Sequence, residues 1–199
     1  MIELKSVSKQ IKEKTVLNNI SLSLQEGKCY LLTGHNGSGK TMLLRLIAGL
    51  MKPTEGEICY DKEYDIGVII ESPQFIKNQT VYQNLENLAT IQKKISKVDI
   101  EDFLDYFNLL TVKDTPVKKL SLGMNQRLAL CQAFMEDQNL ILLDEPFNAL
   151  DEENITQLVK LILKKKKEDK IIVIAAHNIN DNVQLIFDEN YEMENGSLK

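Results

Sequence analysis

The chain has 199 residues, of which 43% are hydrophobic and 27% charged, and its formal net charge is −5. This composition fits a globular protein with a sizeable core, and its net acidity gives no sign of nucleic-acid binding through bulk charge. The longest apolar runs are far shorter than the ~20 residues that span a bilayer, and the N-terminal MIELKSVSKQ lacks the apolar core of a signal peptide. We therefore expect a cytoplasmic protein.

Strand and helix patterns alternate through the first seventy residues. ELKSVSK and VLNNISLSL alternate apolar and polar side chains as half-buried strands do, and CYLLTG is a short apolar run typical of a buried strand. KTMLLRLIAGL predicts a helix over 40–50, which Gly49 and then Pro53 end. GEICY and YDIGVII predict two further strands.

The pattern becomes mainly helical after Pro73. Helices are predicted over 81–110, 121–136, about 151–167 and about 179–187, with strands LILLD (140–144) and KIIVIAAH (170–177) and a final hairpin that turns at Asn195-Gly196. Strands that alternate with helices predict an α/β core with a mainly parallel sheet, into which a helical lobe at about 72–135 is inserted. The lysine run at 164–167 is expected to be a solvated helix end.

The segment GHNGSGKT, Gly34 to Thr41, fits the P-loop pattern G-x-x-x-x-G-K-[ST] between an apolar strand and a helix. Its glycines let successive N–H groups point at phosphate oxygens, Lys40 adds a point charge, and the Thr41 hydroxyl suits Mg²⁺. For His35 only the backbone is needed. The predicted nucleotide-binding residues are Gly34, His35, Asn36, Gly37, Ser38, Gly39, Lys40, Thr41 and Met42.

Two acids end the apolar run LILLDEP, and a histidine ends IIVIAAH. Ligands of a parallel sheet bind at the carboxyl ends of its strands, so Asp144, Glu145 and His177 are expected on the edge that carries the P-loop. Asp144 would hold Mg²⁺, directly or through water. Glu145 would be the general base for an attacking water, and His177 would orient Glu145 or the water.

The order of motifs GHNGSGKT, LSLGMNQR (120–127), LILLDEP, NALD (148–151) and His177 resembles that of the ATP-binding cassette (ABC) ATPases over essentially the whole chain. LSLGMNQR is similar to the family's signature loop and NALD to its D-loop. The resemblance implies one P-loop NTPase domain with an N-terminal antiparallel β portion, a core of about 1–71 and 136–199, and an inserted lobe of about 72–135.

The resemblance also implies a head-to-tail dimer, a homodimer or a pair with a related subunit, that sandwiches two ATP molecules. One subunit's signature loop would face the ATP of the other, and the D-loop would lie on the dimer contact. The implied signature-loop residues are Ser121, Leu122, Gly123, Met124 and Asn125. The implied D-loop residues are Asn148, Ala149, Leu150 and Asp151.

The sequence departs from the family pattern in three places. Ile11 stands where the family has an aromatic residue that stacks on adenine, so apolar contact replaces stacking. Glu71 stands at the position of a coupling-loop glutamine that contacts Mg²⁺ or water, although Gln74 is an alternative. Leu122 replaces a common glycine, while Ser121 and Gly123 are kept.

The leading functional hypothesis is the ATPase subunit of a membrane exporter for a drug or antimicrobial peptide. Such a subunit would use ATP and Mg²⁺ and lie at the inner face of the cell membrane against a separate permease chain. The alternative from another class is a soluble ABC-type ATPase that acts on the ribosome or DNA, although no second cassette or long coiled coil is present. A small-molecule P-loop kinase would not need LSLGMNQR or NALD.

Overall fold

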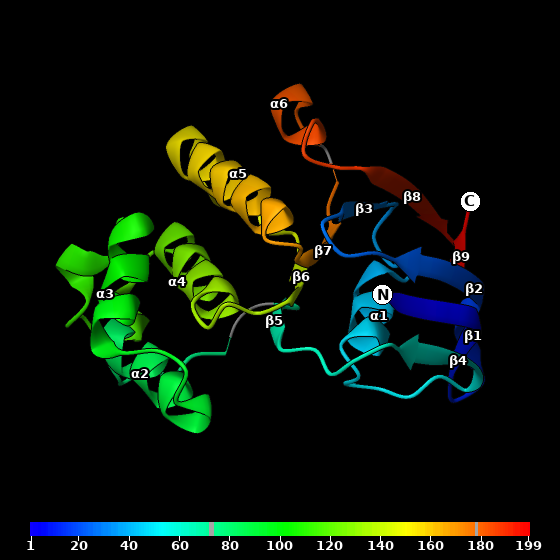
Figure 1. Cartoon of the computed structure of the whole chain (residues 1–199), viewed down its shortest axis with the longest axis horizontal. Coiled ribbons are helices and arrows are strands. Elements are labelled where there is room, and N and C mark those ends of the chain that lie inside the picture. Colours follow the sequence, from blue (N-terminus) through cyan, green and yellow to red (C-terminus); the bar gives the residue numbers. More distant parts are fainter. Residues whose placement is uncertain (72–73, 178) are drawn as a thin grey trace.

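A six-stranded sheet in the order β5-β6-β7-β3-β8-β9 runs through the centre of the computed structural model, which describes residues 1–71, 74–177 and 179–199 (Figure 1). All neighbours in it are parallel except β9, which turns back on β8. The strands are β3 (Cys29–Thr33), β5 (Ile66–Ile69), β6 (Leu140–Asp144), β7 (Ile171–Ala175), β8 (Glu189–Glu194) and β9 (Ser197–Leu198). The predicted α/β fold with a mainly parallel sheet is confirmed.

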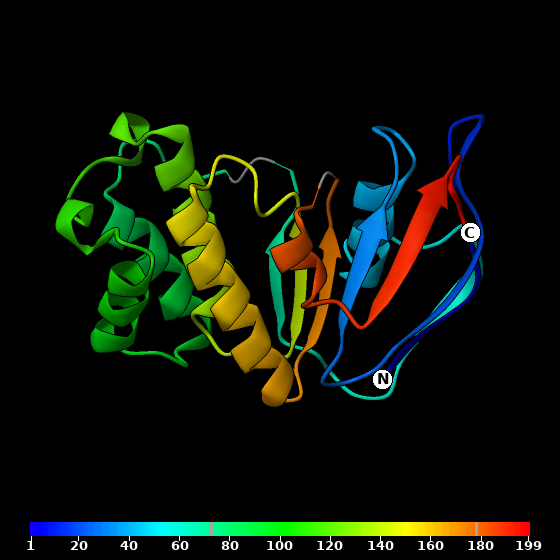
Figure 2. The same ribbon diagram turned by 90° about the horizontal axis from the view of Figure 1, so that it is seen from above.

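A second, antiparallel sheet has the strand order β2-β1-β4 and forms the N-terminal β portion. Its strands are β1 (Ile2–Ile11), β2 (Lys14–Leu24) and β4 (Glu55–Tyr60). Helix α1 (Lys40–Ile47) lies between this sheet and the central one (Figures 1 and 2). Apolar and polar residues alternate along β2, and its apolar residues join α1 in one buried cluster.

The central sheet is buried on both faces because its middle strands are almost wholly apolar. Alternate residues of each strand point to opposite faces. Leu31 and Ile141 belong to the cluster under the lobe and α5, whereas Leu32 and Leu142 belong to the cluster around α1. Continuous apolar strands of this kind are typical of parallel sheets covered on both sides.

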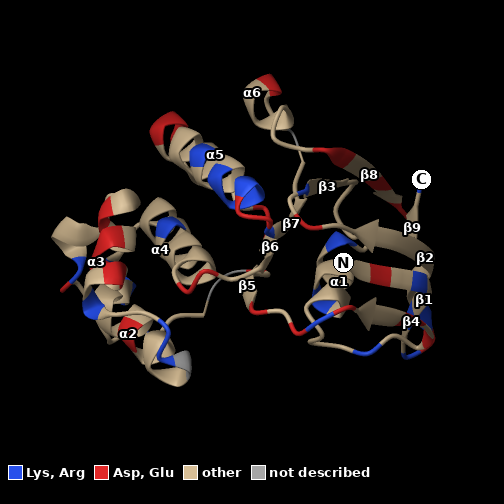
Figure 3. Ribbon diagram, viewed as in Figure 1, with Lys and Arg blue, Asp and Glu red and all other residues tan. Residues whose placement is uncertain are grey.

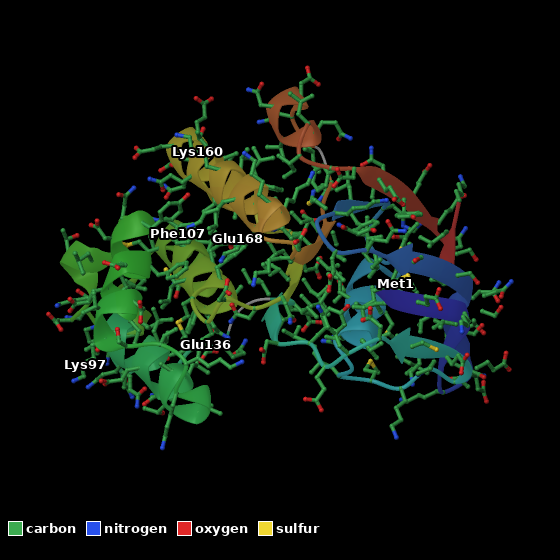
Figure 4. All side chains as sticks on the ribbon, viewed as in Figure 1. Met1, Lys97, Phe107, Glu136, Lys160 and Glu168 are labelled. Carbon is green, nitrogen blue, oxygen red and sulfur yellow. The ribbon has the colours of Figure 1, made fainter. Side chains whose placement is uncertain are left out.

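The inserted lobe contains α2 (Val81–Gln92), α3 (Lys97–Tyr106), two short 3₁₀ turns (Leu110–Val112 and Val117–Lys119) and α4 (Leu122–Phe134). The helical stretch predicted over 81–110 is divided into two helices, because Lys93 adopts a left-handed conformation that ends α2 and Ser96 caps a new helix. Phe107 is buried between the lobe helices, and Lys97 lies on the outer side of the lobe (Figure 4). The predicted lobe begins at residue 72, which with 73 lies outside the described residues.

The C-terminal third contains α5 (Glu152–Lys167) and a short α6 (Asp181–Gln184). The helix predicted over about 179–187 is therefore reduced to about one turn, and the strand predicted to reach His177 ends at Ala175. The hairpin predicted at Asn195-Gly196 is confirmed, since β8 and β9 pair around it. Its Gly196 N–H donates to the Ser38 carbonyl at 2.9 Å, so the hairpin lies against the P-loop.

The lysine run closes α5, whose first turn is acidic and whose last turn is basic (Figure 3). Both ends thus suit the helix dipole. The prediction of a solvated end was wrong for two of the four residues. The Lys165 side chain is 8% exposed and pairs with Asp137 and Glu168, and Lys166 pairs with Asp188. Burial alone would lower the pKa of Lys165, but its carboxylate partners outweigh it and raise that pKa.

Two further observations bear on the class of protein. Throughout the described part of the chain, no helix combines the length and apolar character needed to cross a bilayer. All three cysteines carry free thiols, with Cys29 and Cys131 buried and Cys59 partly exposed. Burial raises the pKa of the Cys29 and Cys131 thiols, which therefore stay protonated.

Candidate functional site

The carboxyl ends of three neighbouring strands bring the predicted site residues to one edge of the central sheet. β3 leads into Gly34, β6 ends at Asp144, and β7 ends two residues before His177. β7 lies between the other two strands, and its Ala175 is in register with both Leu32 and Asp144. The strand-end rule therefore predicted the common location of these residues correctly.

The P-loop wraps closely between β3 and α1. Gly34 has φ 138° and Gly39 has φ 111°, backbone conformations that side chains disfavour. A Cβ atom on Gly34 would stand 2.3 Å from the Met193 carbonyl oxygen, so the loop is also held against β8. Lys40 Nζ donates to the carbonyls of Gly34 at 2.7 Å and His35 at 3.3 Å, which keeps the ammonium at the loop. The His35 ring contacts the neighbouring Asn36 carbonyl at 2.8 Å.

Thr41 and Asp144 meet directly at the start of α1 and the end of β6. The Thr41 hydroxyl donates to Asp144 Oδ2 at 2.6 Å. Burial raises the pKa of the Asp144 carboxyl, the Thr41 hydrogen bond opposes that rise, and the charges of Glu145 and Glu71 add to it. The site therefore concentrates negative charge that a cation would neutralise.

Glu145 and His177 are hydrogen-bonded, with 2.5 Å between His177 Nδ1 and Glu145 Oε1. The Glu145 backbone has φ 51°, an uncommon conformation for a residue with a side chain, and its N–H donates to the Ala175 carbonyl at 2.8 Å. Strained backbone of this kind persists where the surroundings fix it and clusters at functional sites. Here it projects a carboxylate beyond the strand end, where the imidazole contacts it.

A cavity of 1190 Å³ opens along this edge, between the P-loop and α4 of the same chain. Its volume slightly exceeds the range of about 300–1,000 Å³ typical of small-molecule sites. The predicted site residues that line it are Asn36, Gly37, Gly39, Lys40, Thr41, Met42, Glu71, Gln74, Leu122, Asn125, Asp144, Glu145, Asn148 and Ala149. The predicted residues outside its lining are Ile11, Gly34, His35, Ser38, Ser121, Gly123, Met124, Leu150, Asp151 and His177.

Several cavity residues were not predicted from the sequence. Ile11 is 38% exposed and does not line the cavity, whereas Lys14, Thr15 and Val16 on β2 do. The hairpin turn at Asn195 and Gly196 lines it as well. Only the turn had a local signal, since Asn-Gly marks a hairpin, and nothing local indicated that it would face the P-loop. Arg45 was also missed, although it lies one helical turn after Thr41.

The signature and D-loop segments lie together beside the site. Ser121 caps α4 by accepting the Met124 N–H at 3.2 Å, and Asp151 caps α5 by accepting the Asn154 N–H at 2.9 Å. Gln126 donates to the Pro146 carbonyl at 3.1 Å, which ties α4 to the segment after β6. The helix start at Ser121 is therefore a place where backbone N–H groups can bind an anion.

The donor set fits a nucleotide phosphate with Mg²⁺. Ser38 Oγ is buried in the P-loop and has no hydrogen-bond partner among the described residues, and the loop leads through Gly39 into the start of α1. One hydroxyl and one carboxylate, from Thr41 and Asp144, are the oxygen ligands that Mg²⁺ takes when phosphate oxygens and water complete its shell. Within the described residues, no group of three or more His, Cys, Asp or Glu is arranged to hold a metal ion.

Comparison with known proteins gives one consistent result. The profile of the ABC transporter family matches residues 17–148. The chain is 40% identical, over its full length and 95% of the relative, to the uncharacterized ABC transporter ATP-binding protein YybJ of Bacillus subtilis. It is 33% identical to the lantibiotic transport ATP-binding protein SrtF of Streptococcus pyogenes, over 91% of this chain and 82% of the relative.

A third relative and a solved structure extend the comparison. The chain is 33% identical to the bacitracin transport ATP-binding protein BcrA of Enterococcus faecalis, over its full length and 68% of that protein. Its structure matches a dimeric, post-hydrolysis state of the ATP-binding cassette MJ0796 bound to ADP and Pi, with a TM-score of 0.90 and 25% identity over 100% of this chain and 97% of the other.

Proposed function

Since this chain belongs to the ABC transporter family as an ATP-binding, ATP-hydrolysing subunit, we propose that it drives a membrane exporter for a drug or antimicrobial peptide. The observation that carries the proposal is the meeting of the P-loop, Asp144, Glu145 and His177 at one sheet edge. The names of two relatives, which refer to lantibiotic and bacitracin transport, support a peptide substrate.

The P-loop amides and Lys40 would bind the phosphates. Thr41 and Asp144 would hold Mg²⁺, with Glu71 or Gln74 reaching the same site from the loop to the lobe. Mg²⁺ held there would supply positive charge that offsets the charge of the phosphate oxygens. Glu145 would accept a proton from the attacking water. His177, hydrogen-bonded to Glu145, would hold that carboxylate in position.

The dimer is the second part of the proposal. Two subunits would face each other head to tail, so that the first turn of α4 in one contacts the nucleotide of the other. Ser121, Leu122, Gly123, Met124 and Asn125 would form that contact, and the segment 148–151 would lie on the dimer interface. The match to a dimeric cassette supports this arrangement. A homodimer is the simplest assembly, and a pair with a related subunit would keep the same geometry.

The domain division and the location complete the proposal. The core would comprise about 1–71 and 136–199, and the helical lobe about 72–135 would dock on a permease chain at the inner face of the cell membrane. The loop that joins β5 to α2 would report nucleotide state to that partner. Ile11 lies outside the cavity lining. It would therefore contact adenine only if the turn after β1 moves over the base.

Two measurements test this function. Lys40→Ala should abolish tight binding of a fluorescent ATP analogue, and unchanged affinity would contradict the P-loop assignment. The tagged chain should recover a multi-span membrane protein from detergent-solubilised membranes, and this protein should stimulate its ATPase activity. Recovery of ribosomes or DNA instead would favour the soluble ABC-type ATPase.

A further inference from the structure

A salt bridge joins helix α1 to the residue that follows β5. Arg45 Nη2 donates to Glu71 Oε1 at 2.7 Å, across 26 positions of sequence. Arg45 lies four residues after Thr41, so both side chains lie on one face of α1. Glu71 has φ 60°, an uncommon conformation for a residue with a side chain, and it stands at the start of the connection into the lobe.

Both partners belong to the site already described. Arg45 and Glu71 line the same cavity as Thr41 and Asp144, and the Glu71 charge acts on Asp144. The Arg45 side chain is 32% exposed, whereas that of Glu71 is 61% exposed. Arg45 is therefore the more buried member of the pair, and the Glu71 carboxylate reaches it from the residue after β5.

The charges around the cavity explain why such a pair is needed. Three carboxylates line the edge where the polyphosphate would bind, those of Asp144, Glu145 and Glu71. Each of these negative charges repels an anionic ligand. A guanidinium at hydrogen-bond distance offsets that repulsion, and its planar fork fixes the carboxylate more firmly than an ammonium would. A glutamine at position 71 would need no such partner.

We propose that Arg45 is a positioning residue for nucleotide binding, which holds the Glu71 carboxylate at the mouth of the loop and offsets its charge beside Asp144. The inference rests on the proposed function, because the ligand in question is a nucleoside triphosphate with its Mg²⁺. Partly exposed salt bridges contribute little to folding stability. Removal of Arg45 should therefore change nucleotide affinity without changing the melting temperature, which separates this role from a structural one.

The test uses equilibrium titration of the full chain with the fluorescent analogue mant-ATP, with and without Mg²⁺, so that no turnover is needed. Arg45→Met should weaken affinity about tenfold, within the range that directly interacting residues reach. The loss should be larger without Mg²⁺, because the metal otherwise offsets part of the carboxylate charge. Arg45→Lys should fall between wild type and Arg45→Met, and the matched control Lys52→Met, an exposed cation outside the cavity lining, should bind as wild type does.

The decisive variant is Arg45→Met combined with Glu71→Gln. Affinity should return to within about threefold of Glu71→Gln alone, since no unpaired carboxylate remains. Equal weakening by Arg45→Met with either residue at position 71 would overturn the inference, because Arg45 would then act on the nucleotide directly. Unchanged affinity of Arg45→Met would overturn it too. Failure of the wild type to bind mant-ATP would instead contradict the proposed function itself.

Discussion

Gly123 lies so close to Ala149 that a Cβ atom on the glycine would stand 2.7 Å from the Ala149 carbonyl oxygen. The contact joins the first turn of α4 to the segment after β6, and Ala149 itself has φ 61°. The two loops proposed to form the dimer face are therefore in contact within one subunit. A change in one loop must be accommodated by the other.

Gly123→Ala should lower ATP hydrolysis at least tenfold, because a shift of about 1 Å in a positioned group can cost that much or more. Helix propensity alone favours alanine by about 1 kcal/mol, so the substitution would be harmless at a free helical position. Here the Cβ atom has no room, and α4 or Ala149 must move. ATP binding by the monomer should be kept, since the P-loop is untouched. Steady-state ATPase assays measure the hydrolysis, and mant-ATP titration measures the binding. Full ATPase activity would show that the two loops accommodate the added Cβ atom without loss of function.

Glu145→Gln should bind ATP but hydrolyse it about 10²–10⁴-fold more slowly, the usual range for the loss of a general base. The amide keeps the shape of the side chain but cannot accept the proton. Single-turnover hydrolysis and nucleotide affinity measure the two effects separately. The matched control is Glu152→Gln in the first turn of α5, which is exposed, lies outside the cavity lining and should hydrolyse ATP normally. Wild-type turnover in Glu145→Gln would assign the base elsewhere.

Ser121→Arg should leave ATP binding by the monomer intact and prevent ATP-dependent dimerisation. The hydroxyl caps α4, and a long cationic side chain would fill the place where the partner's nucleotide is proposed to dock. We would introduce it into the Glu145→Gln background, which should accumulate the closed dimer, and measure mass by light scattering with and without ATP–Mg²⁺. A dimer that persists in the double variant would argue against a signature loop acting in trans.

Asp188→Asn should destabilise the protein at neutral pH, and the effect should fade in acid. Burial alone would raise the pKa of Asp188, but the Cys29 N–H at 2.7 Å and Lys166 outweigh it and lower that pKa below its usual value. Because the folded-state pKa is the lower one, this contribution is complete above the unfolded value of about 3.9 and is lost as pH falls through the folded value.

Urea unfolding at neutral pH should show that Asp188→Asn lowers the free energy of unfolding by about 1 kcal/mol. The effect is modest because the side chain is partly exposed. The difference from wild type should narrow as pH falls below about 4. Asp181→Asn, at an exposed position in the first turn of α6, is the control and should show a smaller difference at neutral pH. If the difference in the free energy of unfolding between Asp188→Asn and wild type stays constant with pH, the charge of Asp188 does not contribute to stability.

Much of the fold could be predicted because its strands carry strong local signals. β3, β6 and β7 are continuous apolar runs, and the P-loop fixes where β3 ends and α1 begins. In a parallel sheet the carboxyl ends of the strands lie on one edge, which is why the positions of Asp144, Glu145 and His177 could be predicted together. The break after Gln92 and the shortness of α6 were missed, because left-handed caps and end lengths depend on packing rather than on periodicity.

The rest of the site depends on contacts between distant segments, which no local pattern encodes. Lys14 and Asn195 are 181 positions apart, yet both line the cavity because β9 turns back beside β2. The Arg45–Glu71 pair requires α1 and the end of β5 to meet in space. Sequence reasoning placed Glu71 at the site and left its partner unnamed.

The hairpin turn at Asn195-Gly196 has a consequence for biosynthesis. Gly196 receives a hydrogen bond from Asn18 N–H and donates one to the Ser38 carbonyl, so the cradle that begins at Gly34 is completed by a segment made about 160 residues later. A nascent chain should therefore emerge from the ribosome with a P-loop that still lacks its hydrogen bond from Gly196. We therefore expect the chain to bind nucleotide only late in synthesis, and chains truncated before the hairpin should not bind it.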